Sequence, residues 1–78
     1  MKKIAEDLYQ YKGVYVKKLS NGMYKAHFYI NSISGLCTVS GATQEGFKRV
    51  FNNFVKSNNG INKAMTDEYN SRNFKEVK

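Results

Sequence analysis

Residues 13–30 read GVYVKKLSNGMYKAHFYI, and this stretch decides the fold. Valine, tyrosine, phenylalanine and isoleucine are dense in it, and the turn-forming residues 20–22, SNG, divide it in two. We expect antiparallel strands at about 13–19 and 23–31. A third strand is expected at about 35–40, where glycine bounds another β-branched run.

The length of the turn at 20–22 decides which side chains share a face, because side chains alternate along a strand. A two-residue Asn-Gly turn would place Val16 on the face of Lys25, which mixes apolar and charged side chains. A three-residue loop with a left-handed glycine pairs Leu19 with Met23 instead. We expect this loop, because it gathers the apolar side chains on one face: Val14, Val16, Tyr24, Ala26, Phe28 and Ile30.

The opposite face of the sheet then carries aromatic and basic side chains: Tyr15, Lys17, Lys25, His27 and Tyr29. The third strand adds Cys37 and Val39 to the apolar face. Lysines can neutralise phosphates, and tyrosine rings can stack on unpaired bases, while a sheet can enter the major groove of DNA. We take this face as the first candidate for a nucleic-acid interface. The alternative is that an exposed strand surface carries Tyr and Lys for β-propensity and solubility.

The region after the third strand predicts an amphipathic helix over about 43–56. Thr43 can cap its start, and Glu45 lies where the helix dipole favours an acid. The apolar side chains recur at the spacing of one helix face: Phe47, Val50, Phe51, Phe54 and Val55. Packed on the sheet, this helix gives an α+β fold of three antiparallel strands and one helix, in β-β-β-α order. Lys48 and Arg49 on its other side are further candidates for contacts with nucleic acid.

The length of 78 residues predicts a single domain, with its core at about 12–57 and residues 61–78 as a peripheral helix and tail. Each end could add a short flanking helix. The apolar faces of these helices would be Ile4, Ala5 and Leu8 at the amino end, and Ile61, Ala64, Met65 and Tyr69 at the carboxyl end.

The net charge of +7 attracts polyanions before any specific contact forms. Between Tyr11 and Ser57 the only acid is Glu45, and the cations there are Lys12, Lys17, Lys18, Lys25, Lys48, Arg49 and Lys56. We therefore expect the protein to bind nucleic acid, with DNA favoured. The runner-up is a protein-binding inhibitor or antitoxin-like module that docks on an acidic protein surface.

Catalytic chemistry has few candidates in this sequence. One histidine and one cysteine cannot supply a zinc site, and the expected register places His27 outward and Cys37 inward, which separates a Cys–His pair. Phosphate-cradling glycine motifs are absent. We therefore expect no enzyme activity, cofactor or metal. A single cysteine and the lack of a long apolar run lead us to expect a cytoplasmic protein without a membrane partner.

Three segments resemble the arm-site DNA-binding domain of tyrosine-recombinase integrases. They are residues 13–18, GVYVKK, residues 22–28, GMYKAHF, and residues 42–49, ATQEGFKR, and the resemblance covers residues 12–57. That domain is a three-stranded sheet with a helix, and its sheet reads the major groove. The resemblance implies that Tyr15, Lys17, Lys25, His27 and Tyr29 face DNA. Because no recombinase domain follows, it implies a stand-alone accessory or regulatory factor of a phage or mobile element.

Two other families offer competing resemblances. The chain is similar to HicB-type antitoxins, in which three strands lead through Gly and Thr into a helix, and the comparable residues are Gly35, Thr38, Gly41, Thr43 and Glu45. Double-stranded-RNA-binding domains share an α-β-β-β-α order and rank third. The antitoxin resemblance implies a protein partner in place of DNA.

Overall fold

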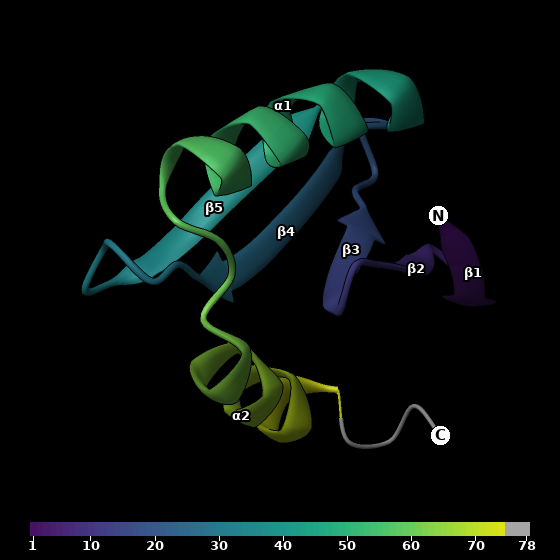
Figure 1. The fold of residues 1–78 in the computed structure, drawn as a ribbon. Coiled ribbons are helices and arrows are strands. Elements are labelled where there is room, and N and C mark those ends of the chain that lie inside the picture. Colours follow the sequence, from purple (N-terminus) through teal and green to yellow (C-terminus); the bar gives the residue numbers. More distant parts are fainter. Residues whose placement is uncertain (75–78) are drawn as a thin grey trace.

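A computed structural model describes residues 1–74 as a five-stranded antiparallel sheet between two helices (Figure 1). The strands follow one another in sequence and in space, in the order β1-β2-β3-β4-β5. The elements are β1 (Lys2–Ala5), β2 (Leu8–Tyr11), β3 (Val14–Lys18), β4 (Tyr24–Tyr29), β5 (Leu36–Gly41), α1 (Gln44–Ser57) and α2 (Lys63–Asn73). Residues 75–78 of the predicted tail lie outside the described part.

The predicted fold of three strands and one helix was wrong, although the α+β class is correct. The amino-terminal segment forms the hairpin β1–β2 and not a short helix. Tyr11 pairs with Val14 across a two-residue turn, and both turn residues, Lys12 and Gly13, have positive φ angles of 51° and 85°. Such turns match the twist of hairpin strands. The turn therefore adds β2 to the edge of β3.

The register of β3 and β4 confirms the three-residue loop. The Leu19 N–H donates to the Met23 carbonyl at 2.8 Å, and Gly22 between them has a φ angle of 88°. Val16 consequently lies opposite Ala26. The apolar side chains of both strands therefore point to one face of the sheet, as predicted.

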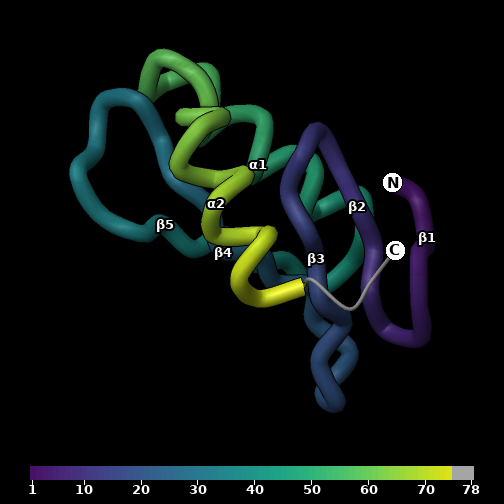
Figure 2. Tube along the Cα trace, turned by 90° about the horizontal axis from the view of Figure 1, so that it is seen from below, coloured from purple at the N-terminus to yellow at the C-terminus, as the bar shows by residue number. Residues whose placement is uncertain are grey.

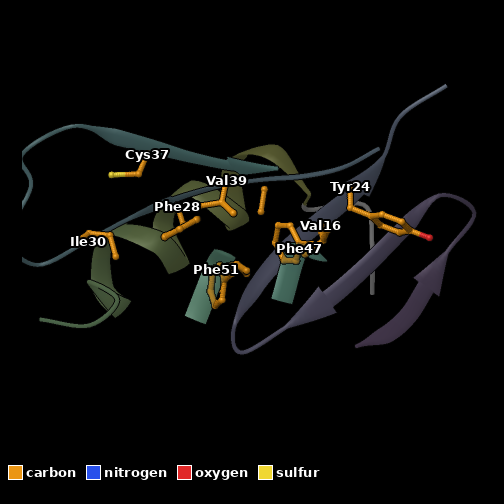
Figure 3. Close-up of a cluster of buried hydrophobic side chains, with 10 residues drawn as sticks. Val16, Tyr24, Phe28, Ile30, Cys37, Val39, Phe47 and Phe51 are labelled. Carbon is orange, nitrogen blue, oxygen red and sulfur yellow. The ribbon is translucent and has the colours of Figure 1, made fainter. Parts of the chain in front are cut away.

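The side chains that β5 directs to the core were also predicted correctly. Phe28 pairs with Cys37, and Ala26 pairs with Val39, so both β5 side chains enter the core. Figure 3 shows this core between the sheet and α1. Its buried members are Val14, Val16, Tyr24, Ala26, Phe28, Ile30, Cys37, Val39, Phe47 and Phe51.

Helix α1 matches the prediction at its start and along its core face. The Thr43 hydroxyl accepts a hydrogen bond from the Gly46 N–H at 3.0 Å, which caps the helix. Phe47 and Phe51 are fully buried against the sheet. Val50 was predicted to share this face, yet it is 49% exposed, because it lies on the flank of the helix beyond the sheet contact. The part of α1 that packs on the sheet is therefore narrower than the apolar face predicted from the sequence.

Helix α2 lies on the other face of the sheet, across β4 towards β3 (Figure 2). Its predicted apolar face was wrong in large part, since Met65 is 43% exposed and Ala64 is exposed. The residues that it buries are Thr66 and Asn70. Ile61 precedes the helix and forms a bridge with Ile30, which extends the sheet contact. The molecule therefore has three layers, and the face predicted to be open is partly covered.

Candidate nucleic-acid interface

The five candidates from the sheet share one face, as the register requires. Lys17 lies directly opposite Lys25 in the β3–β4 pairing. Tyr15, His27 and Tyr29 follow on the same side because strand side chains alternate. This face is opposite to the core, and α2 packs against part of it.

Helix α2 and the residue after it occupy the aromatic part of this face. The Tyr15 ring stacks on Phe74, with centroids 4.5 Å apart and planes inclined by 30°. Tyr69 contacts His27 and Tyr29, with centroid distances of 6.3 and 6.4 Å. The two tyrosine rings that the sequence offered for base stacking are thus engaged within the chain.

Hydrogen bonds from buried polar side chains hold α2 in place. The Thr66 hydroxyl accepts from the Tyr29 N–H at 3.0 Å and lies 3.3 Å from the Tyr29 carbonyl, to which it can donate. The Asn70 side-chain amide donates to the Gly13 carbonyl at 3.0 Å. Thr66 is 1% exposed, so its buried hydroxyl depends on these backbone partners. These contacts join α2 to β4 and to the β2–β3 turn.

Lys17, which is exposed, and Lys25, which is half-buried, lie side by side on this face. Like charges directly opposite each other across two strands are destabilising. Within residues 1–74, neither lysine takes part in an ion pair. In this part of the chain, no ion pair compensates either of the two charges.

The pKa of His27 is lowered by its surroundings on this face. Partial burial lowers the pKa of its imidazole below the ordinary histidine value, and the positive charges of Lys25 and Lys17 lower the pKa further. The ring nitrogen Nδ1 lies 3.0 Å from the Thr38 hydroxyl on β5. The neutral form of the histidine is therefore favoured on this face, and its ring takes part in a hydrogen bond with Thr38.

The solvent side of α1 carries a second set of polar and basic residues. Arg49, Asn53 and Lys56 are exposed, and their spacing of i, i+4 and i+7 places them on one side of the helix. Within residues 1–74, no ion pair involves Arg49 or Lys56. Phe47 and Phe51, which are buried in the core, lie on the opposite side of the helix, because 3.6 residues make one turn. Of the predicted helix candidates, Arg49 belongs to this stripe.

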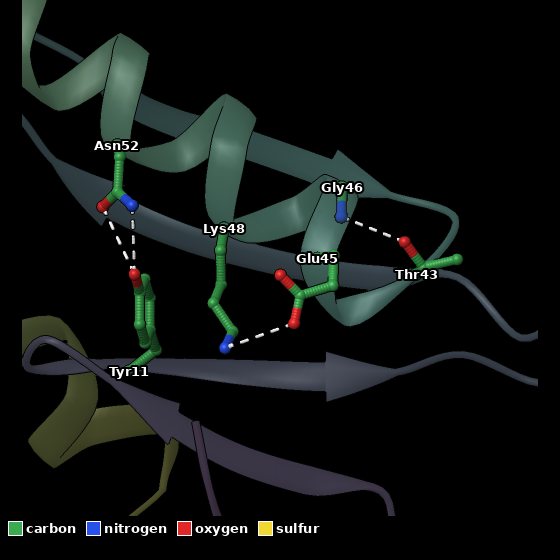
Figure 4. Close-up of polar contacts among 6 residues, drawn as sticks. All are labelled: Tyr11, Thr43, Glu45, Gly46, Lys48 and Asn52. Carbon is green, nitrogen blue, oxygen red and sulfur yellow. Dashed lines mark hydrogen bonds and ion pairs between the residues drawn. The ribbon is translucent and has the colours of Figure 1, made fainter.

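Lys48, the other helix candidate, lies where α1 meets β2 (Figure 4). Its ammonium group is 3.8 Å from the Glu45 carboxylate and 5.9 Å from the centre of the Tyr11 ring. The Lys12 ammonium is 5.4 Å from the same ring and donates to the Asn52 side-chain oxygen at 2.8 Å. Two lysines thus flank one aromatic ring at the edge of the helix.

Sequence reasoning missed the part of this cluster that comes from Tyr11, Lys12 and Asn52. The Asn52 amide donates to the Tyr11 hydroxyl at 3.1 Å, which ties α1 to β2. The Lys12-Gly13 pair was a usable signal, because a glycine in second place favours a two-residue hairpin turn. Recognising that turn would have added β2 to the sheet and placed Tyr11 beside the helix.

Cys37 and His27 lie on opposite faces of the sheet, so they form no nucleophilic pair. Within residues 1–74, no three histidine, cysteine, aspartate or glutamate side chains gather as a metal ion would need. In the same part of the chain, neither helix has the length and apolar character needed to cross a bilayer.

Comparisons with models of protein families, with curated proteins and with solved structures found no match to this chain. The resemblances to integrase arm-site domains and to HicB-type antitoxins therefore stay hypotheses.

Proposed function

We propose that this protein binds nucleic acid, with duplex DNA favoured, through the solvent side of α1. The observation that carries the proposal is the stripe of Arg49, Asn53 and Lys56, which is exposed while the aromatic part of the sheet face is covered by α2. The net charge of +7 supports the same class of partner, because counterion release drives binding to a polyanion.

The residue types of the stripe suit base edges and phosphates. An arginine can form two hydrogen bonds with guanine, and an asparagine can form two with adenine, in the major groove. A helix fits that groove, and its lysines reach the phosphates on either side. In this arrangement Arg49 and Asn53 contact base edges, and Lys56 contacts the backbone.

The cluster around Tyr11 extends the basic surface beyond the helix. Lys12 and Lys48 both lie within 6 Å of the Tyr11 ring, at the β2 side of α1. Lysine contacts to phosphates position a protein on the duplex without reading its sequence. We assign these two lysines that positioning role, next to the stripe.

The sheet-face hypothesis requires a different surface, and the two are on opposite sides of the sheet. Base stacking by Tyr15 and Tyr29 requires α2 to leave its position. Lys17 is exposed there and Lys25 is half-buried, so phosphate contacts are the role that this face still offers. Removing two positive charges from α1 in one variant, and two from the sheet face in another, therefore distinguishes the two proposed interfaces.

The test is a titration of a labelled duplex over a series of salt concentrations. Each of two double variants removes two positive charges: Arg49→Gln with Lys56→Gln, and Lys17→Gln with Lys25→Gln. The helix variant should weaken binding and reduce the log–log salt slope by about 0.9 for each lost phosphate contact. In the sheet variant, the affinity for DNA and the salt slope should both change much less.

Three outcomes would contradict the proposal. Affinity that does not depend on salt removes its electrostatic basis. A larger loss in the sheet variant moves the interface to the face under α2. Absence of binding at low salt excludes nucleic acid and favours an acidic protein surface as the partner. Asn53→Ala adds a test of base contact, since it should relax sequence preference with the salt slope unchanged.

A further inference from the structure

The two edge strands of the sheet differ in how they are protected. β1 carries Lys2 and Lys3, and its register shifts between Lys3 and Ala5. Charged side chains and bulges are the usual means by which proteins keep an edge strand from pairing with another chain. β5 reads LCTVSG, with six residues, no charge and no proline. The β5 edge therefore has none of the features that protect β1.

The backbone groups of β5 that point away from β4 can be identified from the register. Because Leu19 and Met23 form a hydrogen-bonded pair, the odd-numbered residues of β4 direct their N–H and C=O groups to β3. The even-numbered residues then bond to β5, through Cys37 and Val39. It follows that Leu36, Thr38 and Ser40 direct their backbone groups outward, towards the open edge.

Exposed apolar side chains flank this edge on both sides of the sheet. Leu36 on the α2 side is 45% exposed, and Val50 of α1 is 49% exposed. Val50 lies on the opposite side of α1 from Lys48, which faces Tyr11 on β2, so Val50 is on the β5 side. Ile33, just before β5, is 38% exposed. A strand added to β5 would cover apolar surface above and below the sheet.

The charge pattern indicates what can pair with this edge. Residues 30–44 contain no charged side chain, although the chain carries +7 overall. An acidic partner would be attracted to the lysines and arginines elsewhere and not to this segment. A second copy of the chain can approach here without meeting lysine against lysine. Antiparallel pairing of identical strands is also self-complementary about a two-fold axis.

We infer that β5 pairs antiparallel with β5 of a second copy, which joins two sheets into one continuous sheet. The two-fold axis of such a pair is perpendicular to the sheet, so both α1 helices lie on the same face. Leu36 and Val50 of each copy are then covered by the other. The inference does not depend on the proposed function, because it uses the β5 edge and not the basic surfaces.

The first test is the mass of the whole chain in solution, measured by sedimentation equilibrium or light scattering over a wide range of concentrations. The mass should rise with concentration towards twice the 9.0 kDa of one chain. Thr38→Pro removes an outward N–H without removing a bond to β4, and proline is tolerated at such edge positions. Since two-fold symmetry removes the bond twice, the dissociation constant should rise about tenfold or more.

Thr38→Val is the matched control, because it also loses the contact with His27 but keeps the backbone N–H. It should associate like the parent chain. A mass of one chain at every concentration overturns the inference. A folded Thr38→Pro variant that associates as well as the control overturns it too.

Amide hydrogen exchange gives a second test that needs no substitution. The Thr38 and Ser40 amides should exchange fast in dilute solution and become protected at high concentration. The Cys37 and Val39 amides, bonded to β4, should be protected at both. If Thr38→Pro fails to fold, this pattern decides the question. Thr38 and Ser40 amides that stay unprotected at high concentration contradict the pairing.

Discussion

The α1 side and the α2 side of the sheet are each covered by a helix, but different interactions hold the two helices. Under α1 the contact is apolar and includes Phe47 and Phe51, both fully buried. Under α2 the buried helix residues are Thr66 and Asn70, joined to backbone groups by hydrogen bonds. The amphipathic spacing of apolar residues therefore predicts α1, but it does not predict which face of α2 is buried. Because α2 covers part of the outer sheet face, the solvent side of α1 is the surface that we propose for a partner.

The largest effect is expected from the apolar side. Phe51→Ala should lower the free energy of unfolding by about 3–5 kcal/mol, because it removes a ring that packs on Phe28 and Phe47. Val50→Ala on the same helix is the control and should cost far less, since Val50 is half exposed. Urea unfolding followed by circular dichroism measures both. Equal stability of the two variants would mean that the core face of α1 is misplaced.

A smaller effect is expected from the polar side. Thr66→Val keeps the size of the side chain but leaves the Tyr29 N–H without its partner, which should cost about 1–3 kcal/mol. Thr66→Ser keeps the hydroxyl and should lose less. The same urea unfolding measures both variants. If valine is tolerated better than serine, α2 is held by apolar contact, and the distinction between the two sides fails.

The smallest effect concerns His27, at the boundary of the part that α2 covers. Lys25→Gln should raise the pKa of the imidazole, and the pKa should stay below the ordinary value because burial is the larger cause. The one histidine makes its NMR titration unambiguous. Lys56→Gln on α1 removes the same charge on the other side of the sheet and should leave the pKa unchanged. Equal shifts in both variants would contradict the local cause.

The same pKa sets a pH dependence of stability. Because the folded pKa is lower than the unfolded value of about 6.5, the unfolded chain binds the proton more readily. The contribution of His27 to stability is therefore complete above about pH 6.5 and declines as the pH falls below it. Replacing His27 with Gln should remove this part of the pH dependence. An unchanged pH profile would show that His27 does not titrate differently on folding.

The central hairpin and α1 could be predicted from the sequence because local signals agree there. The SNG loop, the alternation around Val16 and Ala26, and the Thr43 cap all point to one arrangement. The hairpin β1–β2 could not be predicted by periodicity, since each strand has only four residues and Ile4 and Leu8 also fit a helix. The pairing of β2 with β3 favours the hairpin over the helix.

The position of α2 depends on tertiary contacts, and no pattern of apolar residues in the sequence predicts it. Thr66 and Asn70 are ordinary surface residue types, and they are buried because Tyr29 and Gly13 offer backbone groups to them. The five sheet candidates therefore share one face as predicted, but that face was predicted to be open and α2 covers part of it. Arg49 was visible from the sequence, while the joining of Lys12 to α1 depends on the unpredicted β2.

The most direct test of this account is an NMR titration of the labelled protein with duplex DNA. It reports the two sides of the sheet at once. The account predicts that chemical-shift changes cluster on Arg49, Asn53 and Lys56 of α1 and extend to Lys12, while the signals of α2 stay in place. Changes centred on Tyr15 and Tyr29, together with displacement of the Tyr69 signals, would contradict it. They would make the face under α2 the interface.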